Sequence, residues 1–196
     1  MKKKEIIALI SFFLLAGPGP TLLFINKYSI SLFPLICMTF MVYVYRVELM
    51  NLNVQKMIYA RNNYAFVWKG VQWSIYFHAA TTLLIRPTPN LTDQLLSSYP
   101  IMAINIVIFA PIFEEIVYRK IIFRFLCSRY NFVIASAISS SIFALGHFSW
   151  DRFLAYFGVG ILFCKIYKDS NSIYPTILAH MILNFIAIIS STLRIS

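Results

Sequence analysis

The chain has 196 residues, of which 60% are hydrophobic and only 12% are charged. A soluble domain of this size carries about a quarter charged residues, so the composition excludes an ordinary soluble enzyme and indicates an integral membrane protein. The net charge of +10 fits cationic loops at a membrane surface. No basic run is long enough to follow a phosphate backbone, so we expect no nucleic-acid partner.

Long apolar runs predict the elements, because about 20 apolar residues in a helix cross a bilayer core. The first run, 5–25, is interrupted at Gly17-Pro18-Gly19-Pro20. We interpret it as an uncleaved membrane helix, since the small residues of a signal-peptide cleavage site are poorly formed. The later runs are 30–49, 64–85, 99–127, 131–148, 153–167 and 173–192. Between them, 50–63 is predicted to be a cytoplasmic loop or an interfacial helix.

These runs predict an all-α, polytopic bundle of about seven transmembrane helices. We divide it into an N-terminal part, residues 1–97, with about three spans, and a C-terminal core, residues 98–196, with about four. Basic residues gather on alternate loops, which predicts a cytoplasmic N-terminus. On that side we place Lys2, Lys3, Lys4, Arg46, Lys56, Arg61, Lys69, Lys120, Arg124, Arg129, Lys165 and Lys168.

Two adjacent acids, Glu114 and Glu115, stand inside the apolar run 99–127. A charge at the centre of a membrane helix costs about 2.5–3.5 kcal/mol on insertion scales, so each one needs a reason. Glu115 and Arg119 are four residues apart, share a helix face and can neutralise each other. This pair could be purely structural. Glu114 projects about 100° away and has no such local partner.

Three further polar residues occur at a comparable depth. His147 ends one apolar run, and His180 and Asn184 share a face of the last run. At 1.5 Å per helical residue, Glu114 and His147 lie about 22 and 27 Å from Arg129, and His180 and Asn184 lie about 18 and 24 Å from Lys168. One slab of the membrane could therefore hold them all. We interpret the remaining histidine, His78, as an interhelical packing contact.

This set of side chains is sufficient for hydrolysis. A carboxylate and a histidine can deprotonate a water, and a second histidine and an amide can donate hydrogen bonds to an oxyanion. The sequence has neither a GxSxG elbow nor an HExxH pair. Glu114, His147 and His180 could still bind zinc, which accepts a His₂Glu set, so that alternative stays open.

The order and spacing of these residues resemble the CPBP family of membrane proteins, the CAAX-protease and bacteriocin-processing group that is also called Abi. The matching motifs are Glu114-Glu115-x-x-x-Arg119, Phe143-x-x-x-His147 and His180-x-x-x-Asn184. The resemblance covers about residues 98–192. It implies a glutamate-dependent intramembrane endopeptidase that needs no metal or other cofactor.

The resemblance also implies roles for the motif residues. Glu114 and His147 would activate the attacking water, and His180 and Asn184 would stabilise the oxyanion. Glu115 and Arg119 would organise the site.

From the small size of the chain we further expect the bacterial type of this family, located in the cell membrane. Its substrate would be a membrane-associated or lipidated peptide or protein, as in bacteriocin maturation, signal-peptide processing or self-immunity. A non-enzymatic immunity or scaffold protein is the main alternative, and a zinc-dependent membrane hydrolase is another. A proton-coupled transporter is the most distant one.

Overall fold

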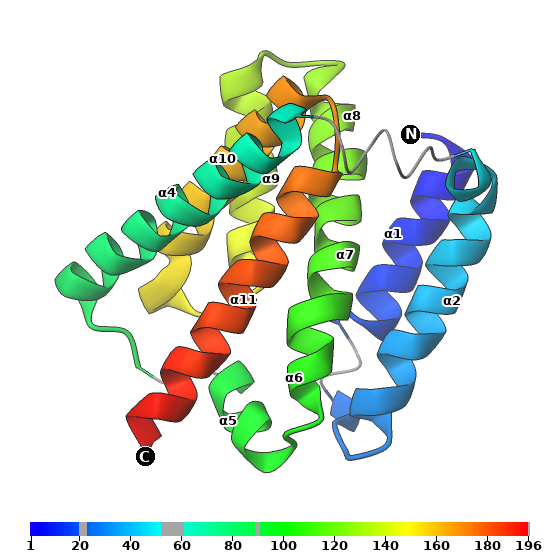
Figure 1. The fold of residues 1–196 in the computed structure, drawn as a ribbon. Coiled ribbons are helices and arrows are strands. Elements are labelled where there is room, and N and C mark those ends of the chain that lie inside the picture. Colours follow the sequence, from blue (N-terminus) through cyan, green and yellow to red (C-terminus); the bar gives the residue numbers. More distant parts are fainter. Residues whose placement is uncertain (20–22, 52–60, 89–90, 196) are drawn as a thin grey trace.

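A computed structural model describes residues 1–19, 23–51, 61–88 and 91–195, and every regular element in those residues is helical, which confirms the all-α class (Figure 1). Most of the predicted loop or interfacial helix at 50–63, including Lys56, lies outside the described residues. The elements are α1 (Lys3–Leu15), α2 (Ser29–Met50), α4 (Arg61–Ile85), α5 (Leu91–Ser98), α6 (Met102–Ile104), η2 (Asn105–Phe109), α7 (Ala110–Glu114), η3 (Glu115–Phe123), α8 (Arg124–Cys127), α9 (Phe132–Leu145), η4 (Trp150–Arg152), α10 (Phe153–Ser170) and α11 (Tyr174–Ile195).

The observed helices follow the apolar runs, with two differences. The first helix, predicted over 5–25, ends at Leu15. Gly17-Pro18 follows at once, and a proline restricts the residue before it to extended conformations, so the helix cannot continue. The second difference is α5, a short helix that lies between the apolar runs 64–85 and 99–127. Two helical stretches, Ser29–Met50 and Tyr174–Ser191, are long and apolar enough to cross a membrane.

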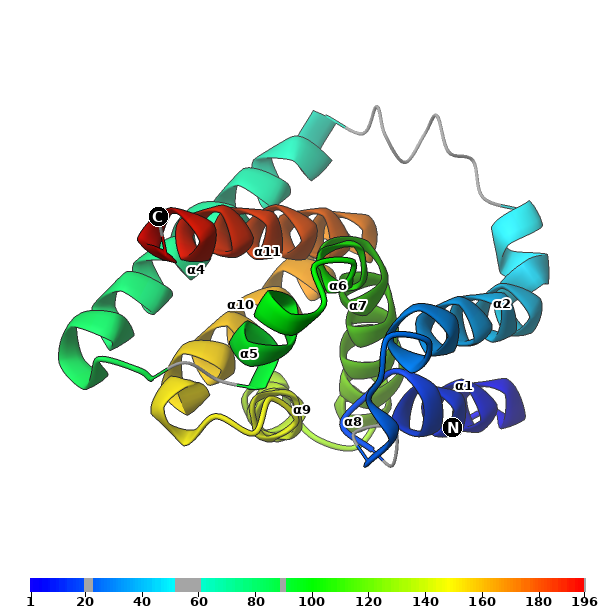
Figure 2. The same cartoon turned by 90° about the horizontal axis from the view of Figure 1, so that it is seen from below.

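Residues 102–127 form one continuous helical rod, α6-η2-α7-η3-α8, which we call the central helix. Figure 2, a view from below, shows α1 and α2 on one side of this rod, with α9, α10 and α11 on the other. The long helix α4 lies outside α10 and α11 and packs against both. The central helix, which carries the two acids, therefore contacts both halves of the chain.

The central helix contains two wide, π-helical stretches, η2 and η3. At the end of the first, the amide of Ala110 donates to the carbonyl of Asn105, five residues earlier rather than four. Pro111 explains the distortion, because a proline ring clashes with the carbonyl four residues before it and offers no N–H. In the second, the amide of Arg124 likewise reaches back five residues, to the carbonyl of Arg119. π-helical turns are uncommon and occur frequently at functional sites.

Small residues let the C-terminal helices approach closely. A Cβ atom on Gly160 of α10 would come within 2.7 Å of the Cβ of Ser140 on α9. Small residues at such positions are typical of helix contacts in membranes. There the hydrophobic effect does not drive helices together, and close packing of their backbones does so instead. The hydroxyl of Ser139, on the same helix, donates to the carbonyl of Tyr118 in η3 at 2.8 Å. Helix α9 is thus fixed both to α10 and to the wide turn of the central helix.

Charged residues join α1 and α2 to the central helix at one end of the bundle. Glu48 of α2 forms ion pairs with Lys4 of α1 and, at 2.6 Å, with Lys120 of η3. Below these pairs a buried apolar cluster joins the same three helices through Phe12, Cys37, Met41, Phe113, Val117 and Tyr118.

Candidate active site

The centre of the site is an ion pair that is closed off from solvent. Arg119 Nε lies 3.2 Å from Glu115 Oε2, and both side chains have no exposed surface. His180 of α11 adds a second contact, with its Nδ1 3.0 Å from Glu115 Oε1. The predicted pairing of Glu115 with Arg119 is therefore confirmed. It is joined by a histidine 65 residues away in sequence.

Glu114 lies beside this pair and shares its histidine. Its Oε2 atom is 3.8 Å from Nε2 of His180, and its side chain is 20% exposed, whereas that of Glu115 is fully buried. His180 thus contacts both acids, with one ring nitrogen toward each. Because Nδ1 faces a carboxylate that is already paired with Arg119, a proton on Nδ1 would leave Nε2 available to a group near Glu114.

The guanidinium of Arg119 is held between aromatic rings. Its Cζ atom lies 4.7 Å from the ring centroid of Phe143 and 5.7 Å from that of Phe163. Within the described residues, its Nη1 and Nη2 atoms have no hydrogen-bond partner. A guanidinium over two ring faces gains cation–π stabilisation, which offsets part of the cost of burying its charge.

His147 lies in the turn after α9. Its Nδ1 is 2.8 Å from the carbonyl oxygen of Phe143, one helical turn earlier. A carbonyl only accepts, so Nδ1 carries the proton, and in the neutral ring Nε2 keeps a free lone pair. The ring of Phe143 contacts both histidines, with centroids 4.7 Å from His147 and 6.0 Å from His180. Phe143 therefore links the two imidazoles.

Asn184 reaches the central helix at a different level. Its side-chain amide donates to the carbonyl of Ile106 at 2.8 Å. That carbonyl cannot receive an N–H from the residue five positions on, because this residue is Pro111, and the amide of Ala110 is used by Asn105. Asn184 therefore satisfies an acceptor that the proline leaves open.

His78, predicted as a packing residue, lies near the site. Its ring meets Tyr156 of α10 edge to face, with centroids 5.8 Å apart. Tyr156 in turn stacks on His147 at 3.8 Å, with an angle of 26° between the ring planes. The sequence analysis missed Tyr156, because an aromatic residue in an apolar run has no feature that marks it as functional.

The six predicted site residues therefore fall into three groups. Glu114, Glu115, Arg119 and His180 are in direct contact. His147 adjoins them through Phe143, and Asn184 contacts the backbone of η2. Among the residues that the structure describes, no group of three or more His, Cys, Asp or Glu side chains is placed to hold a metal ion.

Comparison with known proteins identifies this half of the chain. Residues 96–186 match the family model described as "Type II CAAX prenyl endopeptidase Rce1-like". The chain is 37% identical over 96 residues to "Putative membrane peptidase YdiL" of Bacillus subtilis (strain 168), covering 49% of this chain and 39% of the relative. It is 34% identical over 116 residues to "Membrane-embedded CAAX protease MroQ" of Staphylococcus aureus (strain USA300), covering 55% of this chain and 47% of the relative.

In each comparison the chain spans less than half of the relative's length. No solved structure matches it significantly. The matched stretch contains the central helix, α9, α10 and most of α11, and with them all six predicted site residues. Residues 96–186 of this chain are therefore similar to the Rce1-like proteins of the CPBP family, the family that the three motifs resemble.

Proposed function

We propose that the protein is a glutamate-dependent peptidase embedded in a membrane, which hydrolyses a peptide bond in a membrane-associated peptide or protein. One observation carries this proposal: two adjacent acids meet an arginine and a histidine from a distant helix inside the bundle. All four belong to the motifs that resemble the CPBP family and lie inside the stretch 96–186 that matches the peptidase family model. Burying so many charges costs stability, and a catalytic role gives that cost a reason.

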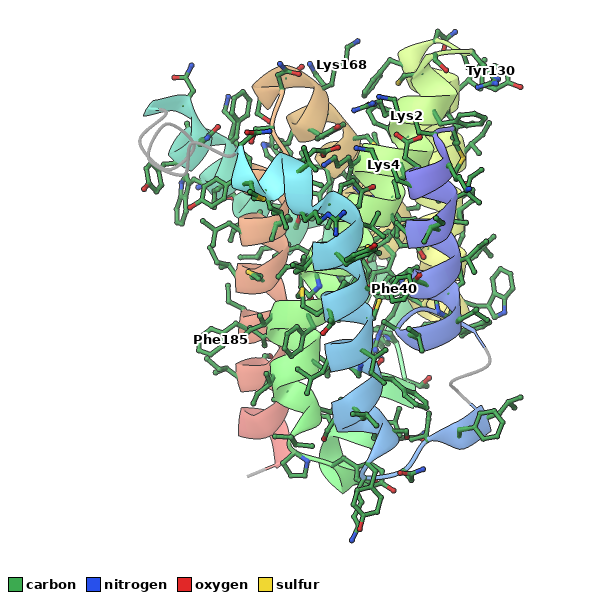
Figure 3. The ribbon with its side chains drawn as sticks, turned by 90° about the vertical axis from the view of Figure 1, so that its right-hand side faces the viewer. Lys2, Lys4, Phe40, Tyr130, Lys168 and Phe185 are labelled. Carbon is green, nitrogen blue, oxygen red and sulfur yellow. The ribbon has the colours of Figure 1, made fainter. Side chains whose placement is uncertain are left out.

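We propose about seven membrane spans, and the surface supports a membrane location. Figure 3 labels Lys2, Lys4 and Lys168 at one end of the bundle, whereas Phe40 and Phe185 project outward from its middle. These two phenylalanines are 46% and 54% exposed, which lipid tolerates better than water. Basic residues at one end favour the cytoplasmic side for that end and for the N-terminus.

In the proposed reaction Glu114 acts as the base. Its carboxylate removes a proton from a water molecule, and the water oxygen attacks the carbonyl carbon of the scissile bond. The lone pair on Nε2 of His147 orients the same water. Proton transfer from Glu114 to the departing amine then completes hydrolysis, with the water's oxygen in the new carboxylate. General-base catalysis of this kind contributes about 10²–10⁴-fold in rate.

The other motif residues would support the charged intermediate. His180, oriented by Glu115, would stabilise the oxyanion in its doubly protonated form, in which Nδ1–H donates to Glu115 and Nε2–H donates to the oxyanion. The buried Arg119 would hold Glu115 in its charged form. Asn184 has one amide proton bound to Ile106. Its second N–H remains a candidate donor to the oxyanion.

We propose that hydrolysis proceeds without a metal and that the substrate is a peptide with a membrane-embedded or lipid-modified segment. The families and names of the similar proteins support this substrate class. Processing of a bacteriocin or a signal peptide in a bacterial cell membrane would fit it.

The decisive experiment compares membrane peptides by mass spectrometry from cells that produce wild-type protein or Glu114→Gln. The glutamine keeps the shape of the side chain but cannot accept the proton, so peptides made by the wild type should fall at least about 100-fold. Glu48→Gln is the matched control, because Glu48 is a paired acid outside the site. Cells that produce this variant should yield the same peptides as cells with the wild type.

Identical peptide sets from wild type and Glu114→Gln, at equal protein levels, would contradict the proposal and favour a non-enzymatic immunity or scaffold role. Loss of the products on adding a chelator, with recovery on adding zinc, would instead favour the metal-dependent hydrolase.

A further inference from the structure

We infer that Tyr156 and His78 are positioning residues that fix the imidazole of His147. The effect of this positioning on catalysis rests on the proposed function, whereas the arrangement of the rings does not. Neither residue belongs to the three motifs, and His78 lies outside the stretch 96–186 that matches the family. The N-terminal half of the chain would thereby contribute to the site.

The ring of His147 needs more than its one hydrogen bond to be oriented. The bond from Nδ1 to the carbonyl of Phe143 fixes one atom of the ring. Rotation about the ring's terminal torsion is otherwise broad, since that torsion has no sharp staggered minima. A misplacement of about 1 Å can cost about 100-fold in rate, so the plane of this ring matters for a group that orients water.

Two aromatic rings supply the missing restraint. Phe143 meets the imidazole edge to face, at 4.7 Å and 71°. Tyr156 lies almost parallel to it, at 3.8 Å and 26°. The imidazole is therefore enclosed from two directions by residues of α9 and α10, and its Nε2 atom can point only where these rings leave room.

His78 supports Tyr156 from the other side. It comes from α4, and its ring contacts Tyr156 at 5.8 Å with an interplanar angle of 81°. Tyr156 is consequently flanked by the imidazole of His147 and the imidazole of His78. Helix α4 packs tightly on this part of the bundle, because a Cβ on Gly158 of α10 would come within 2.9 Å of Phe77. His78 is thus held by its neighbours and can hold Tyr156.

Three substitutions on α10 and one on α4 test the inference in the full-length protein. Tyr156→Leu removes the stacked ring, and Tyr156→Phe keeps it. Phe157→Leu is the matched control, since Phe157 is a half-buried aromatic residue on the same helix that stacks on Phe153 instead. His78→Leu removes the outer support.

The first measurement needs no substrate. Diethyl pyrocarbonate acylates the free nitrogen of an imidazole, and mass spectrometry gives the labelling rate of each histidine in purified protein. We expect Tyr156→Leu to raise the rate at His147 severalfold, with His180 as the internal reference. His78→Leu should raise it less. Tyr156→Phe and Phe157→Leu should leave it unchanged. An unchanged labelling rate of His147 in Tyr156→Leu would show that the ring of Tyr156 does not cover the imidazole.

The second measurement follows the Glu114-dependent peptides as they appear in isolated membranes. Tyr156→Leu should slow them about 10- to 100-fold at an unchanged melting temperature, and Tyr156→Phe should restore them. Normal rates in Tyr156→Leu, or equal losses in the leucine and phenylalanine variants, would rule out positioning by the ring. If no Glu114-dependent peptide exists, the proposed function is wrong, and so is the role of the two residues in catalysis. The labelling result still decides whether the rings are arranged as inferred.

Discussion

Two acidic residues of the bundle have similar partners but opposite surroundings. Glu48 pairs with Lys4 and Lys120 near one end, where its side chain is 40% exposed. Glu115 pairs with Arg119 and His180 in the interior, where the side chains of Glu115 and Arg119 have no exposed surface. Exposed ion pairs are weakened by water and salt, whereas buried ones interact strongly but require the burial of both charges.

The comparison separates two uses of charge. At the partly exposed end, the charges determine which helices pair and in which axial register, and keeping them there costs little desolvation free energy. In the interior, the cost of burial is high, and the pair is stable only while both members are present. The two networks should therefore respond differently to the loss of one partner.

The largest effect is expected for Arg119→Met. The variant leaves Glu115 without its cation in the interior, so the free energy of unfolding should fall by about 3–5 kcal/mol. Thermal unfolding in detergent measures this. The double variant Glu115→Gln, Arg119→Met removes both charges and should recover part of the loss. Equal melting temperatures for wild type and Arg119→Met would contradict the comparison.

A smaller effect should follow Asn184→Leu, which removes a half-buried neutral donor rather than a charge. The carbonyl of Ile106 would lose its partner, costing about 1–3 kcal/mol of unfolding free energy. Adding Pro111→Ala supplies a backbone N–H to this turn and should restore stability. Failure of that second substitution to restore it would show that Asn184 does not act through the carbonyl.

Glu48→Gln should reduce the unfolding free energy by at most about 1 kcal/mol, because Glu48 and both its partners are partly exposed to solvent. The loss should shrink further in high salt, which screens surface charges. Arg119→Met serves as the contrast, since its effect should hardly depend on salt. A salt-independent loss of several kcal/mol in Glu48→Gln would remove the distinction between the two networks.

The smallest effect concerns Asp151, which joins the turn after α9 to the segment after α4. The hydroxyl of Ser149, together with the amide and hydroxyl of Thr88, lowers the pKa of the Asp151 carboxyl to about 2. Since this pKa lies below the ordinary value of 3.8, the carboxylate stabilises the fold fully above about pH 4. The contribution declines as the pH falls toward 2.

Melting temperatures of wild type and Asp151→Asn between pH 7 and pH 2.5 test this. Their difference should stay constant above about pH 5 and narrow below pH 4. Ser149→Ala removes the main cause of the lowered pKa, so in its background the difference should be smaller and its narrowing should end at a higher pH. A difference that widens on acidification would contradict the assigned direction.

Local patterns in the sequence predicted most of the helices and one contact of the site. Apolar runs located the helices, and the spacing of Glu115 and Arg119 predicted their ion pair, because both depend on residues within one helix. Depth arguments brought His180 near the acids. They could not choose which acid it would contact, since that depends on how two helices are rotated against each other.

The remaining features depend on packing between distant segments. No spacing rule predicts that Asn184 meets Ile106, although Pro111 in an apolar run was a usable sign of a carbonyl without a partner. The contact between His78 and Tyr156 depends on where α4 crosses α10. The roles of all six site residues and the count of seven spans stay predictions, to be tested by the variants above.

The wide turns of the central helix also make its length critical. Each one holds a residue more than an α-helical turn would, so deleting one residue from 105–109 could restore ordinary winding. The same deletion would swing everything on one side of it by about 100° relative to the other. Asn184 could then no longer engage its carbonyl while the acids faced His180. We therefore expect single-residue insertions and deletions between Ile106 and Glu114 to be far less tolerated here than substitutions.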